Sequence, residues 1–388
     1  MPGAARRRIR LAMVGGGEGS FVGAAHRVAA RLDDCFELVA GAFSSDPARA
    51  LASGIAIGLP GDRCYGGYGG YEQMVASEAR RDDGAEVVAI LTPNHLHASV
   101  ATACLKHGLD VICEKPLAVS LAEADALVQL SAAQQRLFIV THTYAGYPAV
   151  RHARELVAGG ALGELRVVQV EYAQDWLATD LERTGHKQAG WRTDPAQAGP
   201  AGALGDIGTH AYHLLGYVGG AAVEQVCAEV HTFVPGRPLD DHVQALLRLQ
   251  GGARGMLWAS QVASGEHNAL RLRLYGSRAS IRFDQEEPDT LWFTPLGEPA
   301  QRLRRGALDS PGAAAATRLP PGHPEGWYEA LAQLYRDFAE LWHARAEARV
   351  PPPWAQATPQ LADGRQGLAF IDAVLRSHRA GQRWVSLQ

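Results

Sequence analysis

The sequence predicts two domains: an α/β domain built on a doubly wound parallel sheet over residues 1–145, and an α+β domain with a large, mostly antiparallel open sheet over residues 146–388. In the first part, apolar strands without internal polar alternation are separated by helical segments. In the second part, strand-like segments follow one another with few helices between them. A length of 388 residues fits two such domains.

The first domain is predicted from a repeated alternation of strand and helix. We expect strands at 9–14, 36–42, 87–91, 110–113 and 137–143, and helices at 23–32, 47–51, 96–107 and 121–134. Strands that are apolar throughout are buried on both faces, so helices should cover this sheet on both sides. That arrangement places ligands at the carboxyl ends of the strands.

The second domain is predicted from longer strand-like segments. We expect strands at 167–172, 223–233, 242–249, 255–262 and 270–283, and helices at 206–218, 327–348 and 361–379. Residues 306–324 have no periodicity and contain Pro320-Pro321, which predicts a long loop. An open sheet with one uncovered face would expose a large apolar patch, so we expect a homodimer or homotetramer.

Composition excludes several classes of function. A formal net charge of −4 leaves no basic excess for nucleic acid or acidic lipid surfaces. The five cysteines form no CxxC pair, which favours a reducing compartment over a disulfide framework. Arg6-Arg7-Arg8 resembles a twin-arginine signal but lacks a long apolar segment and a cleavage site. We therefore expect a cytoplasmic protein with a small-molecule partner, no nucleic acid and no membrane.

A glycine turn follows the first expected strand. Gly15 and Gly17 open the turn and Gly23 lies in the following helix, so backbone amides at a helix N-terminus face a space without side chains. Such a turn binds a pyrophosphate, although a merely tight strand-to-helix turn is the alternative. The dinucleotide fingerprint places its third glycine three residues after the second, whereas Gly23 comes six after Gly17.

The residues at the end of the second strand help to distinguish NAD from NADP as the cofactor. A carboxylate that would chelate the adenosine ribose of NAD is absent there or displaced to Asp46. Ser44 and Ser45 can donate to a ribose hydroxyl or to a 2′-phosphate, and no Arg or Lys adjoins them. NAD(H) is therefore favoured, with NADP(H) as the alternative.

Lys115 is the first candidate catalytic residue. It lies in Glu114-Lys115-Pro116, directly after the strand at 110–113 and hence at the edge of the sheet where ligands bind. The chain uses arginine for nearly all its basic residues, yet it has lysine here. Because an ammonium is a compact charge with a tunable pKa, a catalytic use is favoured over a solvated edge residue.

Asp206 and His210 form the second candidate group. A spacing of four places both on one face of a helix, where a carboxylate can orient an imidazole that acts as a base. A helix-capping role for Asp206 is the alternative. Asp206, His210 and His213 also have the residue types of a 2-His-1-carboxylate metal site, but one helical face spreads the ligands along its axis, so we predict no metal.

The glycine turn with His26 and three further motifs together resemble the Gfo/Idh/MocA family, which includes glucose-fructose oxidoreductase and inositol dehydrogenase. The three motifs are Thr92-Pro93-Asn94-His95-Leu96-His97, Glu114-Lys115-Pro116 and Asp206-Ile207-Gly208-Thr209-His210. The resemblance spans nearly the whole chain and is strongest to the MocA-like branch. It implies an NAD(P)-dependent oxidoreductase that acts on sugars, cyclitols or related polyols, with Trp191-Arg192 near the nicotinamide and substrate.

Other polar residues extend the predicted site. Cofactor contacts are expected from Thr92, Asn94, His97, Glu114 and Lys115, with helix capping as the alternative for Asn94. Substrate contacts are expected from Lys115, Asp206, His210, Tyr144 and His323. Domain packing is the alternative for Tyr144 and helix capping is the alternative for His323.

These residues predict a dehydrogenase whose substrate lies between the dinucleotide domain and the second sheet. His210 would take the proton of a secondary hydroxyl, Lys115 would stabilise the developing alkoxide, and Asp206 would orient the base. Two alternatives remain open: a glycosidase or lyase that uses tightly bound NAD(P) transiently, and a non-catalytic nucleotide sensor. The retained Lys115, Asp206 and His210 argue against the sensor, because binding alone requires none of them.

Overall fold

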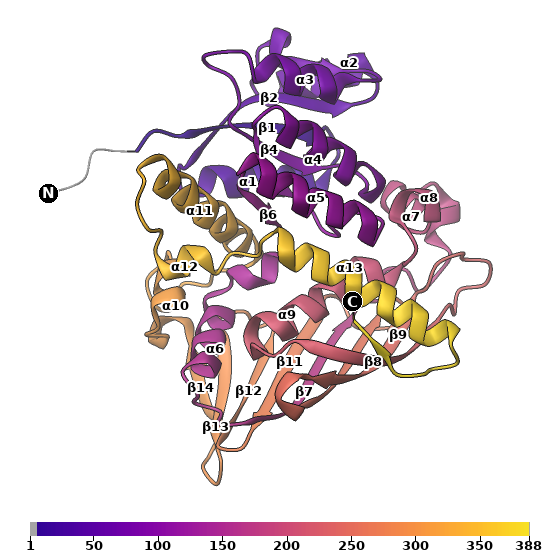
Figure 1. The fold of residues 1–388 in the computed structure, drawn as a ribbon, viewed down its shortest axis with the longest axis vertical. Helices are drawn as coiled ribbons and strands as arrows, with labels where there is room; N and C mark the ends of the chain where they lie inside the picture. Colours follow the sequence, from indigo (N-terminus) through magenta and orange to yellow (C-terminus); the bar gives the residue numbers. More distant parts are fainter. Residues whose placement is uncertain (1–5, 388) are drawn as a thin grey trace, which may run out of the picture. The chain divides into compact units, whose positions relative to one another are not determined.

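The computed structural model describes residues 6–387, and these fall into two compact units. Their described residues are 6–118, 122–141 and 331–362 in the first unit, and 119–121, 142–330 and 363–387 in the second. Each unit is built on its own sheet (Figure 1). Among the described residues, no helix combines the length and the apolarity needed to cross a membrane.

The sheet of the first unit is parallel and doubly wound. Its described strands are β1 (Ile9–Gly15), β2 (Phe36–Ser44), β3 (Cys64–Gly66), β4 (Val87–Leu91), β5 (Asp110–Cys113) and β6 (Phe138–Val140). They are ordered β3-β2-β1-β4-β5-β6 and all pairs are parallel. The order reverses between β1 and β4, so a ligand crevice is expected at the carboxyl ends of these two strands.

Helices connect these strands. They are α1 (Phe21–Leu32), α2 (Pro47–Ala56), α3 (Gly70–Glu78), α4 (His97–Lys106) and α5 (Leu121–Gln134). From Leu331 onward, α11 (Trp327–Ala346) belongs to this unit, as does α12 (Pro353–Gln356). Tyr335 of α11 packs edge-on against Phe36 at the start of β2, with ring centroids 5.3 Å apart, which extends the apolar core.

The second unit contains a nine-stranded sheet with one parallel pair. Its strands are β7 (Leu165–Ala173), β8 (Val223–His231), β9 (His242–Leu249), β10 (Arg254–Ser260), β11 (Ala269–Gly276), β12 (Ala279–Asp284), β13 (Thr290–Pro295), β14 (Gln301–Arg304) and β15 (Val385–Ser386). Within the described range they are ordered β14-β13-β12-β11-β7-β10-β9-β8-β15. Among the strands of residues 6–387, only β7 and β10 in this sheet pair in parallel, which confirms the predicted, largely antiparallel sheet.

Helices contact the sheet of the second unit. They include α6 (Pro148–Ala158), α9 (Thr209–Gly219) and α13 (Leu361–Arg379), of which α13 belongs to this unit from Asp363 onward. Helix α9 contacts β7, β10 and β11, and α6 contacts β12 and β13 (Figure 1). Three shorter helices, α7 (Lys187–Arg192), α8 (Pro195–Ala198) and α10 (Pro311–Ala316), lie in the connections.

Several predicted elements are corrected by the structure. The strand expected at 270–283 is two strands, because the chain turns at Ser277-Arg278 and places β11 beside β12. The long loop expected at 306–324 contains α10, which begins at Pro311, a residue suited to the first helical position. Helix α3 and strand β3 were not expected, because Gly66, Gly67, Gly69 and Gly70 interrupt the apolar pattern there.

Candidate active site

The glycine turn after β1 is folded so tightly that side chains would not fit. Gly15 and Gly16 have φ of 79° and 70°, a left-handed conformation that favours glycine. A Cβ on Gly23 would lie 2.1 Å from the carbonyl oxygen of Gly16, and one on Gly17 would lie 2.9 Å from that of Phe43. Helix α1 therefore begins directly against the turn, as a pyrophosphate-binding turn requires.

Polar groups around this turn fit a dinucleotide. Ser20 caps α1 by accepting a hydrogen bond of 3.1 Å from the backbone N–H of Gly23. Thr92 follows β4, the strand beside β1, and its buried hydroxyl has no partner among the described residues. An unpaired buried hydroxyl is costly unless a ligand satisfies it, so the crevice beside the glycine turn suits a polar cofactor.

The end of β2 explains the missing carboxylate. Asp46 caps α2, because its Oδ1 accepts the backbone N–H of Arg49 at 2.8 Å. Ser44 accepts the backbone N–H of Asp46 at 3.1 Å, and Ser45 is exposed. Asp46 is thus engaged in helix capping, which leaves Ser44 and Ser45 as the predicted contacts for the adenosine ribose.

Glu114 is held by a network of buried side chains at the end of β5. Its Oε1 lies 3.0 Å from Nε2 of His26, whose Nδ1 lies 2.8 Å from the hydroxyl of Tyr335. The hydroxyl of Thr141 also donates to Glu114. Burial raises the pKa of Glu114, but the hydrogen bond and charge of His26, the charge of Lys115 and the Thr141 hydrogen bond together outweigh it and lower this pKa from 4.5 to about 2.

We predict that Glu114 stabilises the folded state. A drop in pKa from 4.5 to about 2 corresponds to at most about 3 kcal/mol at neutral pH, which Glu114→Gln should remove from the free energy of unfolding. A lowered carboxyl pKa stabilises the fold above the unfolded value, so the contribution is lost as the pH falls from about 4.5 towards 2.

Urea unfolding of wild type and Glu114→Gln at a series of pH values checks this prediction. The difference between the two proteins should be largest above pH 5 and should shrink below pH 4. Glu72→Gln, at an exposed position of α3, is the matched control and should leave the stability nearly unchanged. A Glu114→Gln difference that stays constant down to pH 3 would contradict the assignment.

Lys115 follows Glu114 and precedes Pro116 across a cis peptide bond. His97, at the start of α4, is buried beside this segment, with Nδ1 2.7 Å from the carbonyl oxygen of Pro116 and Nε2 2.9 Å from that of Thr92. These contacts give His97 a part in fixing the backbone after Lys115. Asn94, the first residue of the short helical turn Asn94–Leu96, is also buried.

In the second unit, Asp206 lies in a π-helical turn, Leu204–Gly208, that leads into α9. Such turns are frequent at functional sites. Its Oδ2 accepts a hydrogen bond of 2.9 Å from Nε2 of Gln261, and it lies 3.4 Å from Nε of Arg192. About a fifth of the Asp206 side chain is exposed, which leaves the carboxylate accessible to a ligand.

His210 lies one turn further along, among aromatic rings. The ring of Tyr144 packs edge-on at a centroid distance of 4.8 Å, His142 at 5.6 Å and Tyr172 at 6.1 Å. The imidazole is mostly buried, with 8% of the residue exposed. These rings restrict its rotation, which a positioned base requires. The structure therefore brings together Tyr144, Asp206 and His210, which were predicted to contact the substrate.

His213, the third residue of the hypothetical metal site, packs against His142. Its ring stacks on that of His142 with a centroid distance of 4.0 Å and an interplanar angle of 2°. Burial lowers its pKa to about 4, so the ring is neutral at physiological pH. Within residues 6–387, no group of three His, Cys, Asp or Glu side chains is placed to hold a metal ion.

Trp191 and Arg192 end the short helix α7. The guanidinium of Arg192 lies 4.2 Å from the ring centroid of Trp191, and both side chains donate to the amide oxygen of Gln188. Arg192 also reaches Asp206, so this pair adjoins the carboxylate that is predicted to orient the base. His323 is exposed in the loop before α11, and its ring contacts none of the described rings around His210.

The sequence reasoning missed several polar residues near Asp206 and His210. Tyr172 shares a hydrogen bond with Tyr144 and donates to Asn268 at 2.6 Å. Gln174 also donates to Asn268, at 2.8 Å. Tyr172, Gln174 and Gln261 lie at the carboxyl ends of the parallel strands β7 and β10 or just after them. A polar residue directly after a buried strand was the available signal.

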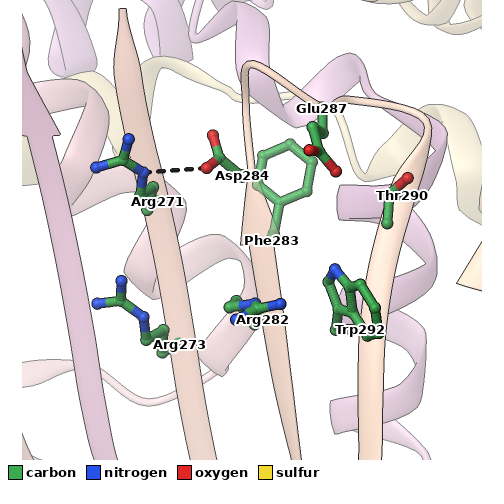
Figure 2. Close-up of a pocket in the computed structure, with 8 residues that line it drawn as sticks. All are labelled: Arg271, Arg273, Arg282, Phe283, Asp284, Glu287, Thr290 and Trp292. Atoms are coloured by element: carbon green, nitrogen blue, oxygen red, sulfur yellow. Dashed lines mark hydrogen bonds and ion pairs between the residues drawn. The ribbon is translucent and has the colours of Figure 1, made fainter. Parts of the chain in front are cut away.

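A separate pocket lies on the outer face of the sheet. Figure 2 shows Arg271 and Arg273 from β11, Arg282 and Asp284 from β12, and Trp292 from β13 along its walls. Arg271 and Asp284 form an ion pair of 3.0 Å. None of the predicted site residues lines this pocket, so it is not the candidate active site.

Comparisons with known proteins agree with this geometry. Residues 9–142 match a family model described as an oxidoreductase family with an NAD-binding Rossmann fold, and residues 150–282 match one described as a GFO/IDH/MocA C-terminal domain. Together with the strand order, the first match identifies the first unit as an NAD-binding Rossmann domain.

Three relatives illustrate the range of matches. An uncharacterized oxidoreductase, YfiI of Bacillus subtilis, is 35% identical over 385 residues, or 98% of this chain and 97% of that protein. Levoglucosan dehydrogenase of Pseudarthrobacter phenanthrenivorans is 30% identical over 79% of this chain and 81% of its own length. The structure of an inositol dehydrogenase homolog from Azotobacter vinelandii, complexed with NADH and myo-inositol, has a TM-score of 0.89 at 36% identity and covers 98% of both chains.

Proposed function

Because the chain belongs to the Gfo/Idh/MocA family of oxidoreductases, we propose that it is an NAD(H)-dependent dehydrogenase that oxidises a secondary hydroxyl of a sugar, cyclitol or related polyol. The observation that carries the proposal is the position of His210, mostly buried among aromatic rings and one helical turn from Asp206. Relatives named for levoglucosan and myo-inositol support the same class of substrate.

We assign the residues the following roles. His210 accepts the proton of the hydroxyl that is oxidised, and Asp206 stabilises the imidazolium that results. The ammonium of Lys115 donates a hydrogen bond to the same oxygen and stabilises the negative charge that develops on it. A bound nicotinamide would supply the hydride acceptor for the carbon, and the products would be a ketone, the reduced cofactor and one proton.

The proposed cofactor is NAD(H) rather than NADP(H). Ser44 and Ser45 are small, and neither neighbours a basic residue that would neutralise a 2′-phosphate. The glycine turn, the Ser20 cap and the unpaired hydroxyl of Thr92 would hold the pyrophosphate and the nicotinamide ribose. Trp191 and Arg192 would border the nicotinamide.

The proposal is tested by following nicotinamide absorbance with the purified protein, NAD or NADP, and a panel of cyclitols, anhydrosugars, sugars and linear polyols. We expect steady formation of NADH with at least one cyclic polyol, a lower kcat/KM with NADP, and no loss of activity after exhaustive chelation. Substrate consumption without net NADH would favour the glycosidase or lyase. Tight NADH binding without turnover of any compound would favour the sensor.

We also propose that the outer face of the nine-stranded sheet pairs with a second copy of the chain. Leu246 and Met256 lie directly opposite one another on β9 and β10, and both are about half exposed. Val167 and Tyr275 form a similar exposed pair on β7 and β11. Exposed apolar residues on adjacent strands are typical of interfaces. Sedimentation should give a dimer or tetramer of the 41.5 kDa chain, and a monomer would contradict this proposal.

A further inference from the structure

Asp240, at the end of the loop between β8 and β9, holds the start of the helical segment that carries Asp206 and His210. Its carboxylate accepts the backbone N–H of Gly202 at 2.7 Å and that of Leu204 at 2.8 Å. Its own carbonyl oxygen accepts the N–H of Ala203 at 2.9 Å. Three consecutive N–H groups at the start of the segment are therefore satisfied by one residue.

This contact is close enough to require glycine on one side. A Cβ on Gly202 would lie 2.1 Å from the carbonyl oxygen of Asp240, so any side chain there would push the two segments apart. The carbonyl oxygen of Gly202 in turn accepts the backbone N–H of Asp206 at 2.8 Å. Asp240 and Asp206 are thus linked through a single residue.

The next residue, Asp241, holds the side-chain partner of Asp206. The carbonyl oxygen of Asp241 accepts the backbone N–H of Gln261 at 2.9 Å, and Nε2 of Gln261 donates to Asp206 at 2.9 Å. The dipeptide Asp240-Asp241 therefore fixes Asp206 by two routes, one through its backbone and one through its carboxylate.

The loop that carries this dipeptide is itself rigidly held. Asp241 accepts the backbone N–H groups of Phe233 and Val234 at 2.8 and 3.0 Å. Arg237 is 1% exposed and uses all of its donors, which reach Asp241, the carboxylate of Glu182 and the carbonyl oxygens of Leu177 and Thr179. A buried guanidinium with every donor paired does not reorient, so the loop gives Asp240 a fixed position.

We propose that Asp240 is a positioning residue for the dehydrogenase reaction, which sets the distance and direction of Asp206 and His210 relative to the substrate without touching it. This inference rests on the proposed function. The inference predicts that replacing Asp240 lowers turnover, because the substrate hydroxyl is still bound but its proton is misaligned with the imidazole of His210. The glycine turn and Thr92, which are proposed to hold the pyrophosphate and the nicotinamide ribose, belong to the first unit, so the affinity for NADH should change little.

The test compares Asp240→Asn with the wild type. Asparagine keeps the shape of the buried side chain but sets an NH₂ group against one backbone N–H, so one hydrogen bond is lost. We expect kcat to fall by ~10- to 100-fold, the cost typical of a misplacement of about 1 Å. KM and the dissociation constant of NADH should change less than about threefold, because the contacts that bind the ground state and the transition state equally well are kept.

Two further variants make the result decisive. Gly202→Ala keeps the Asp240 side chain but inserts a methyl group that pushes the two segments apart, and it should lower kcat in the same way. Asp110→Asn is the control, since Asp110 is another buried aspartate that accepts a backbone N–H, that of Leu137, at 2.9 Å. Asp110 also forms an ion pair with Arg345, so this variant should lower Tm at least as much as Asp240→Asn, and it should leave kcat unchanged.

The outcomes separate the two proposals. If wild type turns over a polyol and both Asp240→Asn and Gly202→Ala keep its kcat, Asp240 is a structural cap only and the inference is wrong. If Asp110→Asn loses as much kcat as Asp240→Asn, general destabilisation explains the loss and the inference is again overturned. A wild type without turnover would overturn the proposed function, and the inference with it.

Discussion

Replacing Lys115 by Met is expected to lower kcat by about 10²- to 10³-fold, the loss typical when one preorganised donor to a developing oxyanion is removed. Methionine has nearly the length of lysine and no charge, so the variant removes the ammonium with little change in packing. Because the interaction strengthens as the hydroxyl becomes an alkoxide, the loss should fall on kcat more than on KM.

Lys115→Arg should not restore the activity. A guanidinium is planar and larger, and it distributes its charge over a fork of donors, whereas the proposed role needs one compact donor at a single oxygen. The buried Glu114, fixed by His26 and Thr141, sets the backbone directly before this residue and leaves little freedom to accommodate the larger head group.

The chain offers a matched control for this experiment. Its other two lysines are Lys106, the last residue of α4, and Lys187, the first residue of α7, and both are exposed. Lys106→Met removes the same charge from the same unit and should leave kcat unchanged. Calorimetry with NADH should show similar affinities for wild type, Lys106→Met and Lys115→Met. A Lys115→Met variant with normal kcat would remove this lysine from the mechanism.

The parts of the fold that could be predicted from sequence are those with strong local patterns. Strands β4 and β5 and helix α5 have the predicted bounds, because each is a continuous apolar or helical segment limited by polar residues or glycine. Strands β13 and β14 were missed, since Trp292 and Arg302 face the outer side of the sheet and give those segments no apolar alternation. The pairing of β13 with β12, and of β14 with β13, depends on tertiary contacts that a local window does not contain.

The residues of the candidate site also differ in whether the sequence alone could identify them. Asp206 and His210 could be recognised because a spacing of four is a local property of a helix. Gln261 could not be recognised as the partner of Asp206, since 55 residues separate them and the pairing of β10 with β7 and β9 brings its strand end to this place. The role of Asp240 could not be predicted for the same reason, because its hydrogen-bond partners at 202–204 lie on another segment of the chain.

His210→Ala is expected to lower kcat by about 10²- to 10⁴-fold, the contribution typical of a positioned general base. The variant should also change the pH dependence, which the loss of a merely structural residue would not. A base must be neutral to accept a proton, so oxidation by the wild type should rise with pH as the imidazole loses its proton. Without the imidazole this rise should disappear, and the remaining activity should depend only weakly on pH in the neutral range.

Two other histidines make this result specific. His107, exposed at the end of α4, is a control whose replacement by Ala should leave both kcat and the pH profile unchanged. His213 is buried, and its pKa is lowered to about 4, so it is a weak base that cannot substitute for its neighbour. If His210→Ala kept near-normal turnover with the wild-type pH profile, the base would have to be another group. Lys115 would then be the first candidate, because it is the remaining titratable side chain assigned to the substrate hydroxyl.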